Sequence, residues 1–427
     1  MPVDNTVTSV INLFKTTFLP ESLQFIFAFA PIFLAIFLGK IFWELWVNFV
    51  RSKKILSTKY TLLELKLPKD TWKSPKAMEI FLNSMNNTSD GSKYAQYWKG
   101  DTRPWFSLEL ISVEGVIKFY IWTEDQRKQG IMSALYSQYP EMEIKEVSDY
   151  AQTVHFDPKI LRIWAAEFKL ANKSSAYPIK TYVDYGLDKD PKEEFKVDPL
   201  LPMIEFLGSV GPNQQVWIQI IIRGHVKDNR RKSGKFFEME DAWVEDAKKE
   251  LNEKILLRDP KTKVSGVVNP DTGFAKLPTL TEVEREQALA IERRLTKPAF
   301  DVGIRALYIA KKDVFSAPFG IGGINANMKH FGYEHLNSFK PNGDYWHPKL
   351  GEPWQDFRDF RRNKYGKLAL MAYKRRSLFY PPFEHKHFVL NSEELATIYH
   401  FPGSVSQTPN LERIPSKKSQ APGNLPI

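Results

Sequence analysis

Basic residues gathered in two short stretches are the part of this sequence best suited to binding chemistry. Between residues 358 and 376 eight basic residues accompany one acid, and between 223 and 235 six basic residues accompany one acid. The net charge of the whole chain is +10, so these two stretches hold more than all of it. The candidate binding residues are Arg361, Arg362, Lys364, Lys367, Lys374, Arg375 and Arg376 in the first stretch and Arg230, Arg231 and Lys232 in the second.

Aromatic residues are interleaved with the bases of the first stretch, at Phe357, Phe360, Tyr365 and Tyr373. On a helix, cations and rings in this pattern could neutralise phosphates and stack on the bases of a nucleic acid. The same side chains could lie on anionic lipid, or form a solvated helix face that meets an acidic protein surface. The pattern therefore predicts a binding surface and leaves its partner open.

Motifs for covalent or hydrolytic chemistry are few. The chain has no cysteine, which excludes disulfides, thiol nucleophiles and thiolate metal sites. The Gly-Lys pairs at 39–40, 234–235 and 366–367 lack the following Ser or Thr and the glycine spacing of a phosphate loop. Six of the eight histidines fall in two groups, within 330–347 and 385–400, which could bind zinc only if the fold brings them together. We predict no catalytic, cofactor-binding or metal-binding residue.

An apolar segment near the N-terminus must place these residues beside a membrane. Residues 22–50 are almost uninterruptedly apolar, longer than the roughly 20 residues that cross a bilayer, and Arg51, Lys53 and Lys54 follow at once. Basic residues accumulate on the cytoplasmic side of a membrane helix. We therefore expect a single-pass protein of the plasma (inner) membrane with cytoplasmic C-terminal domains and a short extracytoplasmic N-terminus, 1–21. A cleaved signal peptide and a buried core helix are the alternatives.

Residues 51–157 predict a first soluble domain. Strand-like alternation of apolar and polar residues occurs at 61–67, 105–113, 116–123 and 142–147, and helical spacing at 77–85 and 126–139. The order strand, helix, strand, strand, helix, strand is that of a ferredoxin-like βαββαβ domain. Between the first helix and the second strand, 86–103 is expected to be a polar loop.

Residues 158–390 predict a second, larger α+β domain with inserted helices and a loop. We expect strands at 164–170, 215–222 and 300–310, helices at 199–207, 240–257, 281–295 and 354–379, and a loop at 258–278. This order could arise from a relative of the first domain that carries insertions, although no repeat of residues is visible. A C-terminal motif and a Pro-rich tail fill 391–427.

Several segments together resemble a known family. They are 102–115, 136–140, 143–150, 335–341, 388–403, 413–418 and 424–426. The chain resembles, from its membrane helix to its last residue, the membrane-anchored N-terminal region, itself of unknown function, of type IV secretion and conjugation-type ATPases. These are coupling-protein-like members of the FtsK/HerA class, found in candidate-phylum bacteria (Patescibacteria). The motif at 391–403 is the most specific part of the resemblance.

The resemblance implies a role for the chain. In the family, that motif leads through a Pro-rich linker into a motor domain with a phosphate loop, whereas this sequence stops at Ile427. We expect a non-enzymatic membrane subunit that anchors or scaffolds the ATPase complex in DNA or protein transfer. Its implied partners are a phosphate-loop motor ATPase in trans and further copies in an oligomeric complex.

Two other functions stay open at this point. The first is a membrane-tethered protein that binds nucleic acid, such as DNA, through the patches at 223–235 and 358–376. The second is a metal-dependent hydrolase built from the histidine groups.

Overall fold

The computed structural model describes most of the chain. The longer described segments are 21–68, 73–172, 174–188, 197–226, 239–256, 280–343 and 356–403, with shorter ones at 8–9, 12, 229–231, 267–268, 275–276, 354 and 413–414. The chain divides into two compact units. Unit 1 comprises Met1–Thr58 and Asp90–Thr102, and unit 2 comprises Lys59–Ser89 and Arg103–Ile427.

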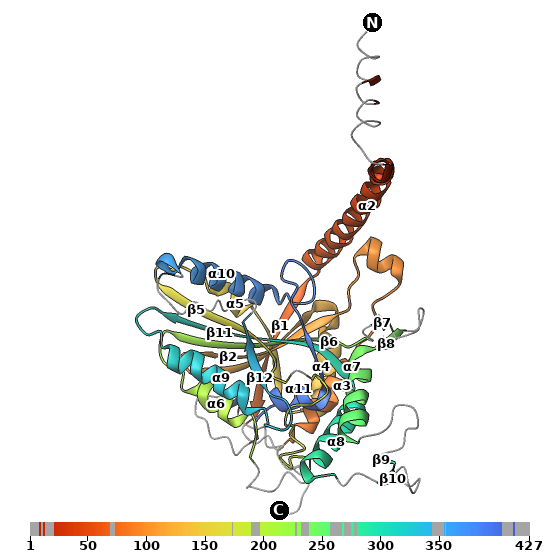
Figure 1. The fold of residues 1–427 in the computed structure, drawn as a ribbon. Coiled ribbons are helices and arrows are strands. Elements are labelled where there is room, and N and C mark those ends of the chain that lie inside the picture. The colour runs from red at the N-terminus through yellow and green to blue at the C-terminus, as the bar shows by residue number, and fades with distance from the viewer. Residues whose placement is uncertain are drawn as a thin grey trace, which may run out of the picture. The chain divides into compact units, whose positions relative to one another are not determined.

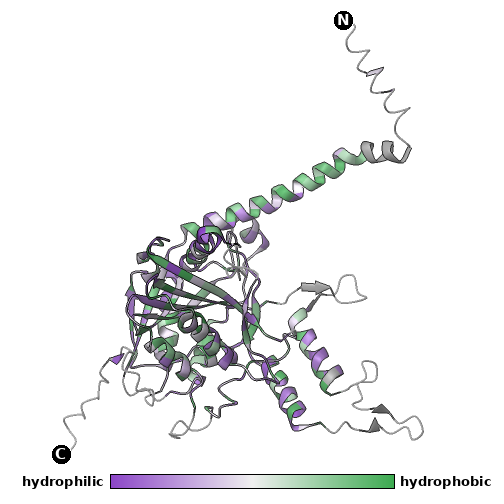
Figure 2. Ribbon diagram, turned by 60° about the vertical axis from the view of Figure 1, so that its left-hand side comes forward, coloured by the Kyte–Doolittle hydropathy of each residue, from purple (hydrophilic) through white to green (hydrophobic). Residues whose placement is uncertain are grey.

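Unit 1 is built on one long helix, α2 (Glu21–Ser57), which carries Pro31 in its interior. Its part from Phe29 to Ser57 is long and apolar enough to cross a membrane, and only 6% of its apolar window is buried. Hydrophobic residues follow one another around this helix with few interruptions (Figure 2). The low burial does not fit a helix of a soluble core, which would be mostly buried, whereas a signal sequence would pass the same test.

The first half of unit 2 has the strand order of a ferredoxin-like fold. Its elements are β1 (Tyr60–Pro68), α3 (Lys76–Met85), β2 (Trp105–Val113), β3 (Val116–Glu124), α4 (Lys128–Gln138) and β4 (Glu143–Val147). They form the antiparallel order β4-β1-β3-β2. The β2–β3 hairpin turns through Glu114 and Gly115, both with positive φ, as tight hairpins require. The predicted α+β fold and the order of its elements are confirmed here.

The second half repeats this topology. Its equivalent elements are β5 (Leu161–Leu170), α6 (Leu201–Gly208), β6 (Gln214–Gly224), β11 (Ala299–Lys311), α9 (Gly323–His330) and β12 (Phe339–Asn342). They form the order β12-β5-β11-β6, which matches the first half strand for strand. The two halves therefore share a topology, although no repeat of residues is visible in the sequence.

Strands β2 and β6 join the two halves into one sheet. They pair antiparallel, from Trp105 opposite Arg223 to Val113 opposite Gln215. Within the described part of the chain the sheet has ten strands, and there only the short β14 (Arg413–Ile414) runs parallel to its neighbour, β1. The boundary predicted after residue 157 falls between α5 (Tyr150–Thr153) and β5, and both halves belong to the same unit.

Inserted elements enlarge the second half. Between β6 and β11 lie β7 (Asn229–Arg231), β8 (Met239–Asp241), α7 (Ala242–Lys249), the π-helix η3 (Glu250–Ile255), β9 (Val267–Val268), β10 (Ala275–Lys276) and α8 (Glu282–Leu295). Helix α8 begins with a capping box formed by Thr281 and Glu284. After β12 come η6 (Phe357–Asp359), α10 (Phe360–Arg375), β13 (Phe388–Asn391) and α11 (Ser392–Ile398).

The two faces of the sheet differ in character. Successive strand residues point to opposite faces, and the alternate set that includes Leu108, Ile220 and Ile304 forms the large apolar core. Helices α3, α4, α6, α9 and α11 cover that face, whereas α10 and α5 lie on the other side (Figure 1). The side chains under α10 are markedly more polar, and they include most of the charged groups considered next.

Candidate functional site

A row of polar side chains crosses the centre of the sheet beneath α10. One stands in the middle of each of four adjacent apolar strands: Glu109 in β2, Gln219 in β6, Arg305 in β11 and Glu167 in β5. The register places Glu109 opposite Gln219, Gln219 opposite Arg305, and Arg305 opposite Glu167. All four are buried. We call these four residues the polar row.

Hydrogen bonds run along the polar row without a break. Gln219 Nε2 donates to Glu109 Oε1 at 2.9 Å, and Gln219 Oε1 accepts from Arg305 Nη1 at 3.3 Å. Arg305 Nη2 donates to Glu167 Oε1 at 2.7 Å. The amide of Gln219 thus presents its donor to a carboxylate and its acceptor to a guanidinium, so charge and hydrogen bonding agree at every step.

Arg376 closes one end of the row. Its Nε and Nη2 donate to the two carboxylate oxygens of Glu109 at 2.9 and 3.1 Å, and Nη2 also donates to Asp149 at 2.9 Å. Burial alone would lower the pKa of Arg376, but the charges and hydrogen bonds of Glu109 and Asp149 raise it well above the ordinary value. Burial would likewise raise the pKa of Asp149, and Arg376 lowers it instead.

Aromatic hydroxyls and a histidine complete the surroundings of the row. The Tyr150 hydroxyl donates to Glu109 Oε2 at 2.9 Å and lies 2.7 Å from that of Tyr373, on α10. Burial, and then the nearby charge of Glu109, raise the pKa of both hydroxyls well above its ordinary value. At the other end, His385 Nδ1 lies 2.8 Å from Glu167 Oε1.

The expectation that Arg376 binds an outside partner is therefore wrong. The residue ends α10 in a left-handed conformation, its side chain is fully buried, and Glu109 and Asp149 already occupy its donors. Counting bases along a sequence cannot separate an inward base from an outward one. The sequence did contain a sign of this buried ion pair in its acidic partner, because Glu109 is the single ionisable residue of the apolar strand β2.

The other candidate bases of the first stretch lie on α10. Arg361, Lys364, Lys367 and Arg375 are exposed, and their spacing places them on one side of the helix. Phe357 and Phe360 are exposed beside them, at the N-terminal end. We call these six residues the α10 face.

Two predicted bases of α10 are turned partly inward. Arg362 is half-buried, and its Nη1 donates to Asp359 at 2.8 Å. Lys374 is half-buried too, and its Nζ donates to the carbonyl oxygen of Val154 at 2.7 Å. Burial lowers the pKa of Lys374. These two side chains therefore contribute less than the α10 face to any external contact.

The second predicted patch is only partly covered by the described residues. Arg230 and Arg231 belong to β7, which pairs with β8, and Lys232 lies outside the described residues. Arg223, at the start of the same stretch, is an internal residue. Its Nε donates to Asp301 at 2.8 Å, and its guanidinium lies 4.2 Å from the ring centre of Phe379.

Two arginines and two histidines surround Asp301 of β11, namely Arg103, Arg223, His225 and His387. Nδ1 of His225 lies 2.6 Å from Asp301 Oδ1. Burial opposes the charged form of Asp301, but the hydrogen bond from His225 and the charges of His387 and Arg223 lower its pKa. Burial likewise opposes protonation of His225, yet Asp301 and Asp241 together raise its pKa.

The two histidine groups do not form a metal site in the described part of the chain. His385 faces Glu167, His387 faces Asp301, and His400 Nε2 lies 2.9 Å from Asp198. His335 pairs with Glu286 at 3.0 Å, and His347 lies outside the described residues. Each described partner is a different carboxylate, and among these residues no three metal-ligating side chains converge.

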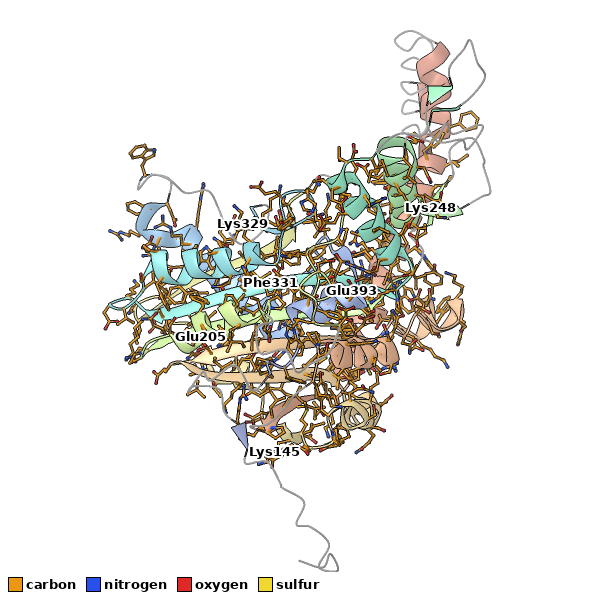
Figure 3. The ribbon with its side chains drawn as sticks, turned by 90° about the horizontal axis from the view of Figure 1, so that it is seen from below. Lys145, Glu205, Lys248, Lys329, Phe331 and Glu393 are labelled. Atoms are coloured by element: carbon orange, nitrogen blue, oxygen red, sulfur yellow. The ribbon has the colours of Figure 1, made fainter. Side chains whose placement is uncertain are left out.

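The C-terminal motif at 391–403 forms hydrogen bonds and ion pairs with other parts of the fold. Asn391 and Glu394 form a capping box at the start of α11, and Glu394 accepts from Arg294 Nε at 2.9 Å. Glu393, which lies among packed side chains in Figure 3, is 2.7 Å from Lys297 Nζ, and the same ammonium is 2.7 Å from Glu79 of α3. Because α3 belongs to the first half, the motif ties both halves together.

A protein-family model matches the larger part of the chain. The model of a domain of unknown function, DUF8128, matches residues 53–327. This span contains the whole polar row and ends before α10 and α11 begin. No curated protein matches the chain.

We expect Arg376→Met to destabilise the protein strongly, because it leaves Glu109 charged and buried without its main partner. Breaking one side of a buried ion pair costs about 3–5 kcal/mol. Arg375→Met, one residue earlier and exposed, should change the free energy of unfolding by less than about 0.5 kcal/mol. Urea unfolding of the full chain in detergent, followed by near-ultraviolet circular dichroism, measures both.

The double variant Arg376→Met with Glu109→Gln serves as an internal check. Replacing both charges removes the unpaired carboxylate, so it should recover part of the stability lost in Arg376→Met. Equal stability of Arg376→Met and Arg375→Met would show that the buried pair does not hold the fold.

A second prediction concerns pH. His225 has a raised pKa in the fold, so its stabilisation is fully present below about pH 6.5, the ordinary histidine value, and is lost as the pH rises through the raised value. The stability difference between wild type and His225→Asn should therefore shrink as the pH rises above about 6.5. Urea unfolding at several pH values tests this, and a difference that stays constant over the range would refute it.

Proposed function

The chain belongs to the DUF8128 family of domains of unknown function, and from that premise we propose that it is a non-enzymatic, membrane-anchored scaffold subunit. One observation carries the proposal. The charged side chains that converge in the described part of unit 2 neutralise one another inside the fold, where a substrate would not reach them.

Three arginines illustrate this internal use of charge. Arg305, Arg376 and Arg294 are all fully buried, and each donates to a buried carboxylate. A catalytic group has to come within hydrogen-bonding distance of its substrate. These groups instead hold strands and helices together, which favours a protein that acts through its surface.

The anchor is helix α2 and its short link to the sheet. Only Thr58 and Lys59 lie between the end of α2 at Ser57 and the start of β1 at Tyr60. A link of two residues gives the chain little length between the end of α2 and the start of the sheet. The bases that follow the apolar segment favour the cytoplasmic side of the plasma (inner) membrane.

The resemblance to type IV secretion and conjugation-type ATPases supplies the partner. Ferredoxin-like halves occur in proteins of many functions, so the fold itself names none. On the basis of the resemblance, the scaffold holds a phosphate-loop motor ATPase at the inner face of the membrane. The complex would then transfer DNA or protein across the envelope, with several copies of the chain around the motor.

Purification of the tagged full chain from its own membranes in mild detergent tests this function. We expect mass spectrometry to find a phosphate-loop ATPase in near-stoichiometric amount, and ATP hydrolysis only in fractions that contain it. An unrelated single-pass protein with the same tag is the control. Recovery of the chain without an ATPase, or hydrolysis by the chain alone, would overturn the proposal.

The α10 face favours a second candidate function, the binding of nucleic acid. Its exposed cations could bind the phosphates of a nucleic acid, and its exposed rings could stack on the nucleobases. This reading would make the chain a membrane-tethered nucleic-acid-binding protein.

Charge reversal tests this candidate. If the face binds DNA, Arg361→Glu with Lys364→Glu and Lys367→Glu should weaken binding and reduce the slope of log affinity against log salt by about 2 to 3, at roughly 0.9 per phosphate contact. The matched control reverses three exposed lysines on β4, α7 and α9, namely Lys145, Lys248 and Lys329 (Figure 3). Equal effects of the two triple variants would show that the α10 face is not a specific site.

A further inference from the structure

Unit 1 contains a cluster of aromatic rings that the sequence did not reveal. The segment 86–103 was expected to be a polar loop, but its part from 90 to 102 belongs with α2 and contains the π-helix η1 (Ala95–Lys99). The ring centroid of Trp43 lies 5.5 Å from that of Tyr97 and 6.3 Å from that of Trp98, and Trp46 lies 5.7 Å from Trp98. We call these four residues the aromatic cluster.

The loop fits closely against the backbone of the helix. Gly100 has a φ of +75°, and a Cβ added there would lie 2.5 Å from the carbonyl oxygen of Val50. The Asp101 amide donates to the Ala95 carbonyl oxygen at 3.0 Å, which closes the turn. Asp101 also lies 3.8 Å from Lys54 Nζ. The loop is thus held at one height along α2.

The outward side of this assembly is aromatic and exposed. Tyr94 is 64% exposed, Trp98 54% and Trp43 42%. They lie where the character of α2 changes, beside the exposed Lys40–Glu44 ion pair and before the bases from Arg51 onwards. Tryptophan and tyrosine side chains concentrate at this kind of boundary, the interface between lipid and water, because one end of each is apolar and the other polar.

We propose that the loop 90–102 is an interfacial anchor, in which the aromatic cluster and Tyr94 lie among the phospholipid headgroups at the boundary of the bilayer that α2 crosses. This inference rests on the proposed membrane anchoring. The roughly 20 residues needed to cross a bilayer then end near Trp46, and the last three turns of α2 stand in water. The loop fixes the depth of the helix, because the close contact at Gly100 prevents it from sliding along α2.

The chain lacks cysteine, so single cysteines can carry a nitroxide label that reports depth in reconstituted phospholipid vesicles. Collisions of the label with oxygen and with a nickel chelate give the depth. Tyr94→Cys tests the loop, Phe37→Cys reports the apolar part of α2, and Lys248→Cys reports water in unit 2. We expect the label at residue 94 to lie at a depth between the other two.

The outcomes separate the anchor from the membrane span. A label at residue 94 as accessible to the chelate as that at 248, with the label at 37 deep, would overturn the interfacial anchor and leave the span standing. A label at 37 that is open to the chelate would overturn the proposed membrane anchoring itself.

A glycine substitution provides a second test. Gly100→Ala should move the label at residue 94 towards water, because the added Cβ meets the Val50 carbonyl oxygen and the positive φ disfavours alanine. Gly39→Ala, at a position with nothing within 4 Å of the added Cβ, is the matched control and should leave the depth unchanged. An unchanged depth in both variants would show that the loop does not depend on its fit to the helix.

Discussion

The hydrogen-bonded polar row fixes the register in which two ferredoxin-like halves share one sheet. A slip of one residue between β2 and β6 would turn every side chain of one strand to the wrong face. It would also separate Glu109 from Gln219 and leave a buried carboxylate without its partners, which costs several kcal/mol. Apolar packing alone would tolerate more than one alignment of such similar strands, so the row supplies specificity that the apolar core does not.

The segments that follow the second half complete both faces of this sheet. On the polar face, α10 brings the Tyr373 hydroxyl to that of Tyr150, and Arg376, the residue that ends the helix, to Glu109. On the apolar face, α11 brings Glu393 towards Lys297. The described residues from 356 to 403 therefore serve the fold first, and the outward side of α10 remains exposed for another molecule. This division explains why one stretch of bases contains both a structural residue and candidates for binding.

Features that depend on composition and periodicity could be predicted, whereas those that depend on distant partners could not. The apolar run predicted α2, and alternation predicted the βαββαβ order around Glu114 and Gly115. The burial of Arg376 depends on Glu109, which is 267 residues away. Likewise, 86–103 has a polar sequence, and the role of its aromatic residues becomes visible only from their ring contacts with Trp43 and Trp46. A single ionisable residue inside an apolar strand was the one local sign of the polar row.

The outer borders of the sheet bear on how several copies could assemble. One border is β12, which has four residues and includes Pro341, a residue without an amide hydrogen to donate. The other is formed by β4, with five residues, and β14, with two. Such short strands offer little backbone for pairing with a second sheet. In the proposed assembly of several copies on a membrane, these edges would discourage pairing edge to edge, so an ordered complex would be built from helix surfaces.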